Sequence, residues 1–265
     1  MTGARSIIVP RRYDVVVGSF GGVGTTFFIR FLSRFKAVND HRDRDGFKHL
    51  PMPPLSFNPN IRLVFIYGDP VAATVSIFRR GFQQWQSEKL LRYSRTLAPI
   101  SRDTTLDEYA RQQVDRLLFA EQFHNWRSRY LFYPTLFINY ERMWGNLESI
   151  FEFLEIPKSE MPNFPSRRPR SSSQADISPD TLEGLNRMYS GFKRELDRIQ
   201  DIEVLNPKRS ASMSMILRKP VYRYAILQQL LDSIHIYISQ KRSLKQHPGS
   251  CSEEAEQNPG QQEDV

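Results

Sequence analysis

A glycine- and threonine-rich segment near the start of the chain carries residue types that can bind a phosphate group. Residues 18–26 read Gly18-Ser19-Phe20-Gly21-Gly22-Val23-Gly24-Thr25-Thr26. Glycines allow several backbone N–H groups to converge on an anion, and a helix that begins after such a segment adds partial positive charge. The two threonines supply hydroxyl donors, so the segment predicts a site for a phosphate-containing ligand.

The same segment is similar to a Walker A loop with two changes. Ser19 takes the place of the first glycine, and Thr25 takes the place of the lysine. A nucleoside triphosphatase needs that lysine on its β- and γ-phosphates, so triphosphate hydrolysis is disfavoured. Another P-loop activity, such as that of a nucleotide kinase, is a minor alternative. A tight strand-to-helix turn that binds nothing is the structural alternative.

The elements predicted around the segment place it between a strand and a helix. Tyr13–Val17 is a β-branched run that ends at Gly18, and Thr25–Phe35 has the apolar spacing of a helix. Further strands are predicted at Arg62–Tyr67 and Leu136–Asn139. Further helices are predicted at 71–80, at 105–129 with Asp103 or Thr104 as the cap, at 144–154, and at 178–199 with a Ser178-Pro179 start. This alternation predicts one α/β domain with a parallel sheet.

Three segments, taken together, resemble the sulfotransferase family. Gly24-Thr25-Thr26 is similar to the family's loop for the 5′-phosphosulfate of PAPS (3′-phosphoadenosine-5′-phosphosulfate). The strand Arg62–Tyr67, the Asp69-Pro70 turn and Ser76 resemble the segment that holds the 3′-phosphate. The third segment is the strand that runs into Tyr140-Glu141 and the helix that ends at Leu154-Glu155-Ile156-Pro157. The resemblance covers about residues 12–200 and implies a P-loop three-layer α/β/α fold with a central parallel sheet.

The resemblance also implies a nucleotide site, in which two of the family's cations are missing. The implied binding residues are Gly21, Gly22, Val23, Gly24, Thr25, Thr26 and Ser76. The family's lysine or arginine two residues before the Gly-Thr-Thr glycine is Gly22 here, and its 3′-phosphate arginine is Gly68. Candidate replacements are Arg79, Arg80 and a basic loop with Arg167, Arg168 and Arg170. That loop is alternatively a solvated linker, and Ser76 is alternatively a small helix residue packed on the sheet.

Sulfuryl transfer to an acceptor gains from a general base and from cations around the sulfate oxygens. His41, in the charged loop 39–49, is the candidate base, and His49 is a second candidate. Carboxylate candidates are Asp40, Asp43, Asp45 and Glu88. A loop histidine is alternatively an exposed residue without a role. The aromatic run Phe82, Trp85 and Tyr93 either lines an acceptor pocket or forms the buried face of a helix.

The charge of the chain favours an anionic ligand. The 265 residues are 40% hydrophobic and 25% charged, which is typical of a globular protein, and their formal net charge is +8. The stretch Ser243–Val265 holds one lysine and five acids, so removing it from 37 basic and 29 acidic residues leaves 36 and 24, a net charge of +12. Such an excess suits a nucleotide, a sulfated sugar, a nucleic acid or a lipid surface, or is simply a solvated basic surface.

Cysteine content and segment composition set the expected compartment and divisions. Cys251 is the single cysteine, which excludes a disulfide framework and a Cys-based zinc site and favours a reducing compartment. With no signal peptide or membrane span visible, we expect a cytoplasmic protein. The predicted divisions are an N-terminal arm (1–12), a P-loop domain (13–205), a basic linker with an amphipathic helix at Val221–Ser239 (206–242), and a disordered acidic tail (243–265).

The favoured function is a PAPS-dependent sulfotransferase acting on a hydroxyl or amine of a small molecule, sugar or peptide, with PAPS as co-substrate and no metal. The alternative is a catalytically inactive member that binds the nucleotide or serves as a scaffold, which the missing cations at Gly22 and Gly68 favour. No nucleic-acid partner is expected, and a homo-oligomer is an open possibility.

Overall fold

The computed structural model describes residues 8–56, 58, 60–91, 97–127, 132–167, 176–207 and 227. The predicted acidic tail and, apart from residue 227, the predicted helix Val221–Ser239 lie outside the described residues. Tyr93, Arg168 and Arg170 lie outside them as well. Within the described part of the chain, no helix is long and apolar enough to cross a membrane.

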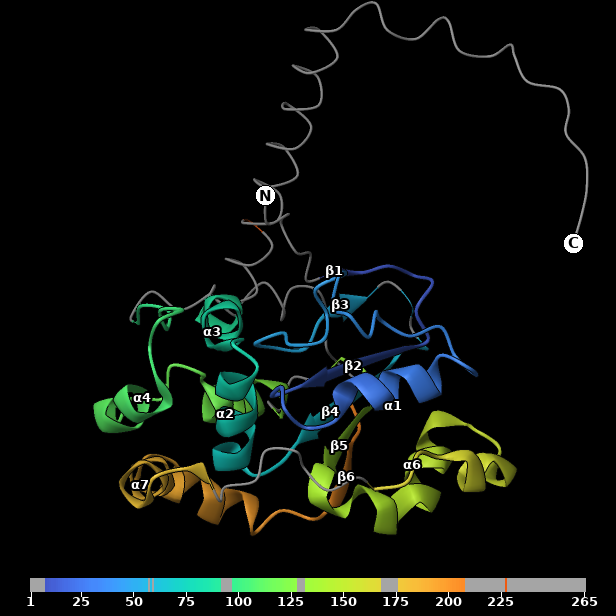
Figure 1. Ribbon diagram of the computed structural model, residues 1–265. Helices are drawn as coiled ribbons and strands as arrows, with labels where there is room; N and C mark the ends of the chain where they lie inside the picture. Colours follow the sequence, from blue (N-terminus) through green and yellow to red (C-terminus); the bar gives the residue numbers. More distant parts are fainter. Residues whose placement is uncertain are drawn as a thin grey trace, which may run out of the picture.

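A four-stranded sheet forms the centre of the molecule (Figure 1). Its strands, in spatial order, are β2 (Val15–Ser19), β4 (Arg62–Tyr67), β5 (Thr135–Asn139) and β6 (Ile202–Leu205). The first three are parallel and β6 is antiparallel to β5, so one row across the sheet reads Val17, Val64, Leu136 and Val204. The short strands β1 (Ile8–Val9) and β3 (Leu55–Ser56) pair separately and in parallel. The predicted α/β fold is confirmed, with a mostly parallel sheet.

Helices cover both faces of this sheet, which explains the nearly continuous apolar runs in β2 and β4. On one face lie α1 (Thr25–Leu32) and α6 (Leu147–Leu154), whose Phe31 and Phe151 rings are 5.6 Å apart. On the other lie α2 (Pro70–Arg79), α5 (Phe119–Trp126) and α7 (Pro179–Leu196). Phe65 of β4 packs on Trp126 of α5 with ring centroids 4.8 Å apart. These contacts give the three expected layers.

The single long helix predicted at 105–129 is wrong. The structure has α4 (Leu106–Gln112) and α5 instead, and between them Gln113 and Leu118 have left-handed φ angles of 53° and 50°. Asp115 accounts for the break, because its carboxylate accepts hydrogen bonds from the amides of Leu117 (3.1 Å) and Phe119 (3.0 Å). It thereby supplies partners for N–H groups at the start of α5, which the helix itself cannot satisfy.

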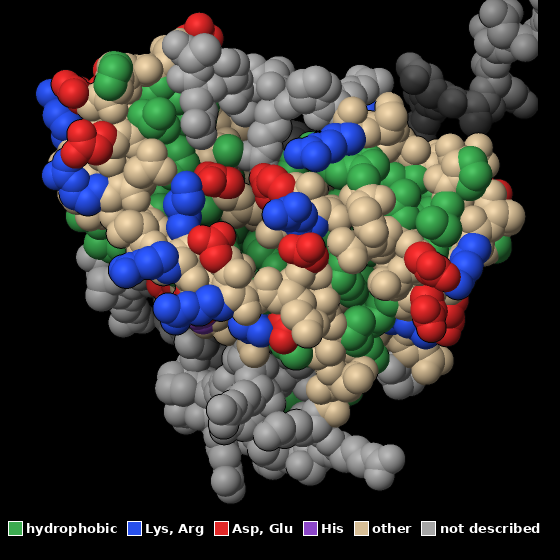
Figure 2. Space-filling view, turned by 90° about the horizontal axis from the view of Figure 1, so that it is seen from below, with side chains coloured by type: hydrophobic (Ala, Val, Ile, Leu, Met, Phe, Trp, Pro, Cys, Tyr) green, Lys and Arg blue, Asp and Glu red, His purple; other side chains and the backbone are tan. Residues whose placement is uncertain are grey.

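The remaining elements differ from expectation mainly at their ends. Thr105, and neither Asp103 nor Thr104, caps α4, in a reciprocal capping box with Glu108. The predicted Ser178 cap of α7 is confirmed, because its hydroxyl accepts a hydrogen bond from the amide of Thr181 at 3.2 Å. The remaining helices are α3 (Gln83–Leu91), η1 (Tyr140–Asn146) and η2 (Lys158–Asn163). On the face drawn in Figure 2, basic and acidic side chains alternate around apolar ones.

Candidate functional site

The loop after β2 has the backbone shape that an anion site requires. Gly21, Gly22 and Gly24 have φ angles of +89°, +70° and +69°, a region that side chains other than glycine rarely enter. Gly24 is the residue before α1, and no side chain caps the helix there. The first amides of α1 therefore have no partner within the helix and point beyond its N-terminus, where the helix dipole is positive.

Gly22 packs directly against α2 and leaves little room for a side chain. A Cβ atom at Gly22 would lie 3.0 Å from Ser76 Cβ and 3.1 Å from the carbonyl oxygen of Ala73. The structure thus places Ser76 beside the loop, in the second turn of α2. Together with the left-handed φ of +70°, this contact disfavours a lysine or arginine at position 22.

The loop's two threonines face different surroundings. Thr25 is buried, and its hydroxyl donates to Ser19 Oγ at 2.6 Å, while the amide of Gly21 donates to the same oxygen at 3.2 Å. Thr26 is exposed and lines a cavity. Of the two hydroxyls expected to face a ligand, the one on Thr25 is already directed into the loop. The side chain of Val23 is fully buried, so only its backbone can contribute to a site.

Lys48 brings a cation to this loop from a distant part of the chain. Its Nζ atom donates to Thr26 Oγ1 at 2.6 Å and to the carbonyl oxygen of His41 at 3.1 Å. Burial lowers the pKa of Lys48, the carboxylate of Asp43 opposes that effect, and Arg80 lowers the pKa further. Sequence reasoning missed Lys48, although its place directly before His49, at the end of the charged loop, was an available signal.

A cavity of about 670 Å³ opens beside Thr26 and Lys48. Five cationic side chains, two histidines and one carboxylate line this cavity. Two aromatic residues line it as well, Phe82 in the loop before α3 and Trp85 in α3. The cationic side chains are Arg30, Arg42, Arg44, Lys48 and Arg80. Gln86 of α3 donates to the carbonyl oxygen of Phe20 at 3.0 Å, which holds this wall against the loop.

The carboxylate in the cavity wall, that of Asp43, serves the structure. It is 2.6 Å from Nζ of Lys89 in a nearly buried ion pair, and it accepts a hydrogen bond from the amide of Lys48 at 2.9 Å. Burial alone would raise the pKa of Asp43, but Lys89 holds it below its ordinary value. Because Asp43 is already neutralised, the cavity as a whole is positive. Asp45 also shapes the loop, accepting hydrogen bonds from the amide of Asp40 and from the Tyr13 hydroxyl.

Both candidate histidines line the cavity, in different settings. Nδ1 of His49 lies 3.1 Å from the carbonyl oxygen of Ser19 and 3.3 Å from Ser19 Oγ. The carbonyl oxygen can only accept, so the tautomer that bonds to it carries the proton on Nδ1 and leaves Nε2 as an acceptor. Burial lowers the pKa of His49 to about 3, so its ring is neutral near pH 7. His41 is more accessible, with Nδ1 3.5 Å from Asp40 Oδ1. Partial burial and the charge of Arg30 lower the pKa of His41.

The predicted replacement arginines separate into two groups. Arg80 lines the cavity, and its Nε donates to the carbonyl oxygen of Ser76 at 2.8 Å. Arg79 points to Asp176, at 3.4 Å. Arg167 is exposed and is not among the residues that line the cavity. Gly68 stands where the sulfotransferase family has the 3′-phosphate arginine. Near this turn, Nζ of Lys193 of α7 lies 3.1 Å from Asp69 Oδ2.

An aromatic hollow of about 430 Å³ lies on the other side of α1 and shares Arg30 with the cavity. Phe27 and Trp144 stack in its wall with centroids 5.8 Å apart, and Tyr140 meets Trp144 edge-on at 5.4 Å. A Cβ atom at Gly24 would collide with the Phe27 and Tyr140 rings, each 2.4 Å away. The loop between β2 and α1 therefore adjoins both a cationic cavity and an aromatic hollow.

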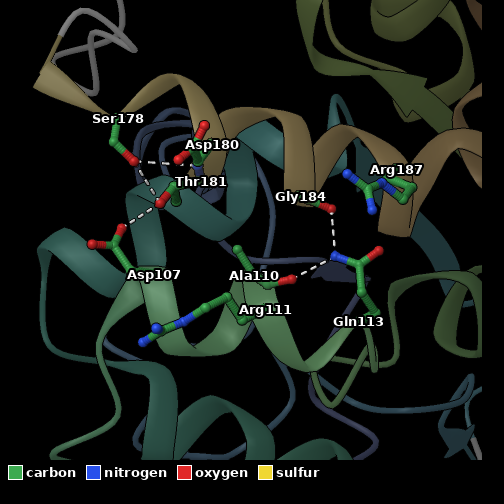
Figure 3. Close-up of a pocket in the computed structure, with 9 residues that line it drawn as sticks. All are labelled: Asp107, Ala110, Arg111, Gln113, Ser178, Asp180, Thr181, Gly184 and Arg187. Atoms are coloured by element: carbon green, nitrogen blue, oxygen red, sulfur yellow. Dashed lines mark hydrogen bonds between the residues drawn. The ribbon is translucent and has the colours of Figure 1, made fainter.

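A third hollow, of about 400 Å³, lies between α4 and α7, in contact with neither the loop nor Lys48 (Figure 3). Its polar groups largely bond one another: Thr181 Oγ1 donates to Asp107, and Gln113 donates to the carbonyl oxygen of Gly184 at 2.8 Å. These bonds hold α4 against α7. Among the described residues, no group of three or more His, Cys, Asp or Glu side chains is placed to hold a metal ion.

Comparison with known proteins gives one match. A family model described as "Sulfotransferase domain" matches residues 14–168, which is more than half of the chain. The matched span includes the loop between β2 and α1, Lys48, His49, Ser76 and Tyr140. No curated protein and no solved structure matches the chain.

Proposed function

The chain belongs to the sulfotransferase family, and from this premise we propose that it is an active enzyme that transfers a sulfuryl group from PAPS to a hydroxyl or amine acceptor. The observation that carries the proposal is the 2.6 Å contact between Lys48 Nζ and Thr26 Oγ1. It supplies a cation at the proposed phosphate-binding loop, where position 22 carries none. Without such a cation, the loop would offer only backbone dipoles and hydroxyls to a doubly charged group.

The residues around the loop fit the two ends of the donor. The uncapped first turn of α1, Thr26, Lys48 and Arg30 suit the phosphosulfate, because charge-assisted donors converge there. The aromatic hollow beyond Arg30 suits the adenine ring, because stacking of a base on aromatic side chains contributes about 1–3 kcal/mol. Ser76 and Arg80 of the α2 region are proposed as further phosphate contacts, while Arg167, Arg168 and Arg170 remain predicted ones.

The transfer itself needs the chain to hold charge and accept a proton. The acceptor oxygen or nitrogen bonds to sulfur as the bond from sulfur to the phosphate oxygen breaks, and the acceptor's proton passes to a base. Lys48 and the amides of the first turn of α1 stabilise the negative charge left on the phosphate side. We propose His49 as the base, because Ser19 orients its ring with Nε2 free to accept, as in other base–orienter pairs. His41, the base expected from the sequence, is the alternative.

The proposal extends to the chain's wider setting. We propose that residues 13–205 form the catalytic domain, that the protein works in the cytoplasm, and that the reaction needs no metal. The supporting observations are the single cysteine and the family match over residues 14–168.

The second candidate function, nucleotide binding without catalysis, is favoured by the inward-turned Thr25 hydroxyl and the closed position at Gly22. Two measurements on the full chain separate the candidates: thermal unfolding with and without PAP, and transfer of labelled sulfate from PAPS to a broad acceptor panel. We expect both stabilisation by PAP and transfer. Stabilisation without transfer to any acceptor would identify a non-catalytic binder, and the absence of both would overturn the proposal.

A further inference from the structure

The cavity beside the loop contains cationic side chains beyond those proposed to hold the donor. Lys48, Arg30 and Arg80 are the cations proposed for the phosphosulfate and the further phosphate of PAPS. Two more arginines line the same cavity, Arg42 and Arg44, and neither has been assigned to the donor. Water-accessible cations that crowd a cavity repel one another unless an anion joins them. The surplus therefore calls for a second anion.

Arg42 and Arg44 are the cations best placed to meet that anion. Both are exposed at the cavity on the loop 40–48. Among the described residues, Arg42 has no ion-pair partner, and Arg44 reaches only Asp40, at 4.0 Å with its side chain 71% exposed. An exposed pair at that distance contributes little. The cations also act on their neighbours, because Arg30 and Arg42 both lower the pKa of His41.

An aromatic platform lies in the same cavity. Phe82 is 49% exposed, which is unusual for a large apolar side chain, and the Arg80 guanidinium lies 5.4 Å from its ring centroid. Trp85 meets His49 edge-on, with centroids 6.0 Å apart. Exposed rings next to a charged group suit a ligand that has both a flat or ring-shaped apolar part and a polar group.

We infer that the acceptor is a cyclic molecule that already carries a carboxylate, sulfate or phosphate group. Its ring packs on Phe82 and Trp85, and its anionic group binds Arg42 and Arg44. This inference rests on the proposed function, because it names the acceptor class for the same site. It also explains why a chain with a net charge of +8 places five cationic side chains around one cavity.

Two matched acceptors test the inference: phenyl β-glucuronide and its methyl ester, which share both rings and every hydroxyl group and differ by the negative charge of the carboxylate. With the full chain and labelled PAPS, we expect kcat/KM to be at least about tenfold higher for the glucuronide, the size of one charge-assisted contact. The double variant Arg42→Gln/Arg44→Gln should lose most of that preference and keep its stabilisation by PAP. The matched control Arg187→Gln/Arg194→Gln removes the same charge from α7 and should keep the preference.

Binding of the two glycosides to the PAP-saturated protein, measured by titration calorimetry, separates this inference from the proposed function. Tighter binding of the glucuronide that depends on Arg42 and Arg44 supports the acceptor class even if no transfer occurs, in which case only the proposed activity fails. Equal binding and equal turnover of the two glycosides would overturn the inference and leave the activity standing. Failure of both glycosides to bind would overturn the inference as well.

Discussion

The Nζ atom of Lys48 lies 2.6 Å from Oγ1 of Thr26, so a lysine 22 positions away along the chain reaches the first turn of α1. A second hydrogen bond, to the carbonyl oxygen of His41 at 3.1 Å, holds the ammonium group in place. The loop that replaces its own cation with Gly22 is therefore served by a cation from outside it.

Replacing Lys48 with methionine should weaken PAP binding and transfer while the protein stays folded. Methionine keeps the length of the side chain but removes a charge-assisted donor, which is worth about 1.5–3 kcal/mol, or roughly 10- to 150-fold in affinity. PAP affinity by calorimetry and transfer from labelled PAPS measure the effect. Lys158→Met removes a lysine from an exposed ion pair with Glu148 and serves as the control. Unchanged PAP affinity in Lys48→Met would show that the donor does not use this cation.

Restoring the family's cation within the loop should fail. Gly22→Lys puts a side chain where φ is +70° and where Ser76 Cβ is 3.0 Å from the new Cβ atom. The left-handed backbone alone costs about 1–3 kcal/mol for a residue other than glycine, and the contact with α2 adds to it. We expect a lower Tm and weaker PAP binding.

Two other glycines separate the causes of that loss. Gly81→Lys shares the positive φ, +66°, but its Cβ meets open space, so it measures backbone strain alone. Gly191→Lys lies in α7 with open space and without that strain, and should be neutral or slightly stabilising. If Gly22→Lys lowers Tm no more than Gly81→Lys does, the packing of the loop on α2 is not the obstacle described above.

Sequence periodicity was sufficient to locate the three parallel strands of the central sheet. The structure gives β4 the predicted limits, Arg62–Tyr67, because a run buried on both faces leaves little ambiguity. The break between α4 and α5 was beyond reach, because it depends on Asp115 and on the Tyr109 and Tyr189 hydroxyls that donate to it. Tyr189 is 74 positions from Asp115, and local spacing carries no trace of such a contact. The strand β6 was missed because its four residues are only partly buried at the sheet edge.

Site residues that lie close together in the sequence could be predicted, whereas those that only the fold brings together could not. The glycines and Thr26 could be named because they follow a strand directly, and Ser76 because its segment resembles the one that holds the 3′-phosphate in the sulfotransferase family. Lys48 joins them only through the path of the loop 40–50, which the Asp43–Lys89 ion pair organises. A buried pair between residues 46 positions apart leaves no mark in spacing or composition.

The two loop threonines should respond differently to substitution. Thr25→Ala removes the buried donor to Ser19 Oγ, so we expect a loss of about 1 kcal/mol in stability, or a decrease of about 2–4 °C in Tm. Thr26→Ala removes an exposed hydroxyl that contacts Lys48, so it should weaken PAP binding and leave Tm nearly unchanged. Thr25→Ser retains the hydroxyl and is the control. The reverse pattern, with Thr25→Ala affecting only PAP affinity, would contradict the orientation of these side chains.

His49 should make the protein less stable in mild acid. Burial lowers the pKa of His49 from 6.5 to about 3. At a pH between these two values, the unfolded chain therefore binds a proton at His49 that the folded protein does not bind. Stability is therefore full above pH 6.5 and is lost as the pH falls towards 3, by at most about 1.4 kcal/mol per pH unit. Urea unfolding between pH 7.5 and about 4.5 measures the slope. His49→Gln should reduce the slope because glutamine does not titrate, and glutamine can still donate to the carbonyl oxygen of Ser19. His41→Gln should change the slope far less, because its ring is only partly buried. An identical slope in the wild type and His49→Gln would mean that His49 gains its proton at the same pH in the folded and the unfolded protein, which would contradict the effect of burial on its pKa.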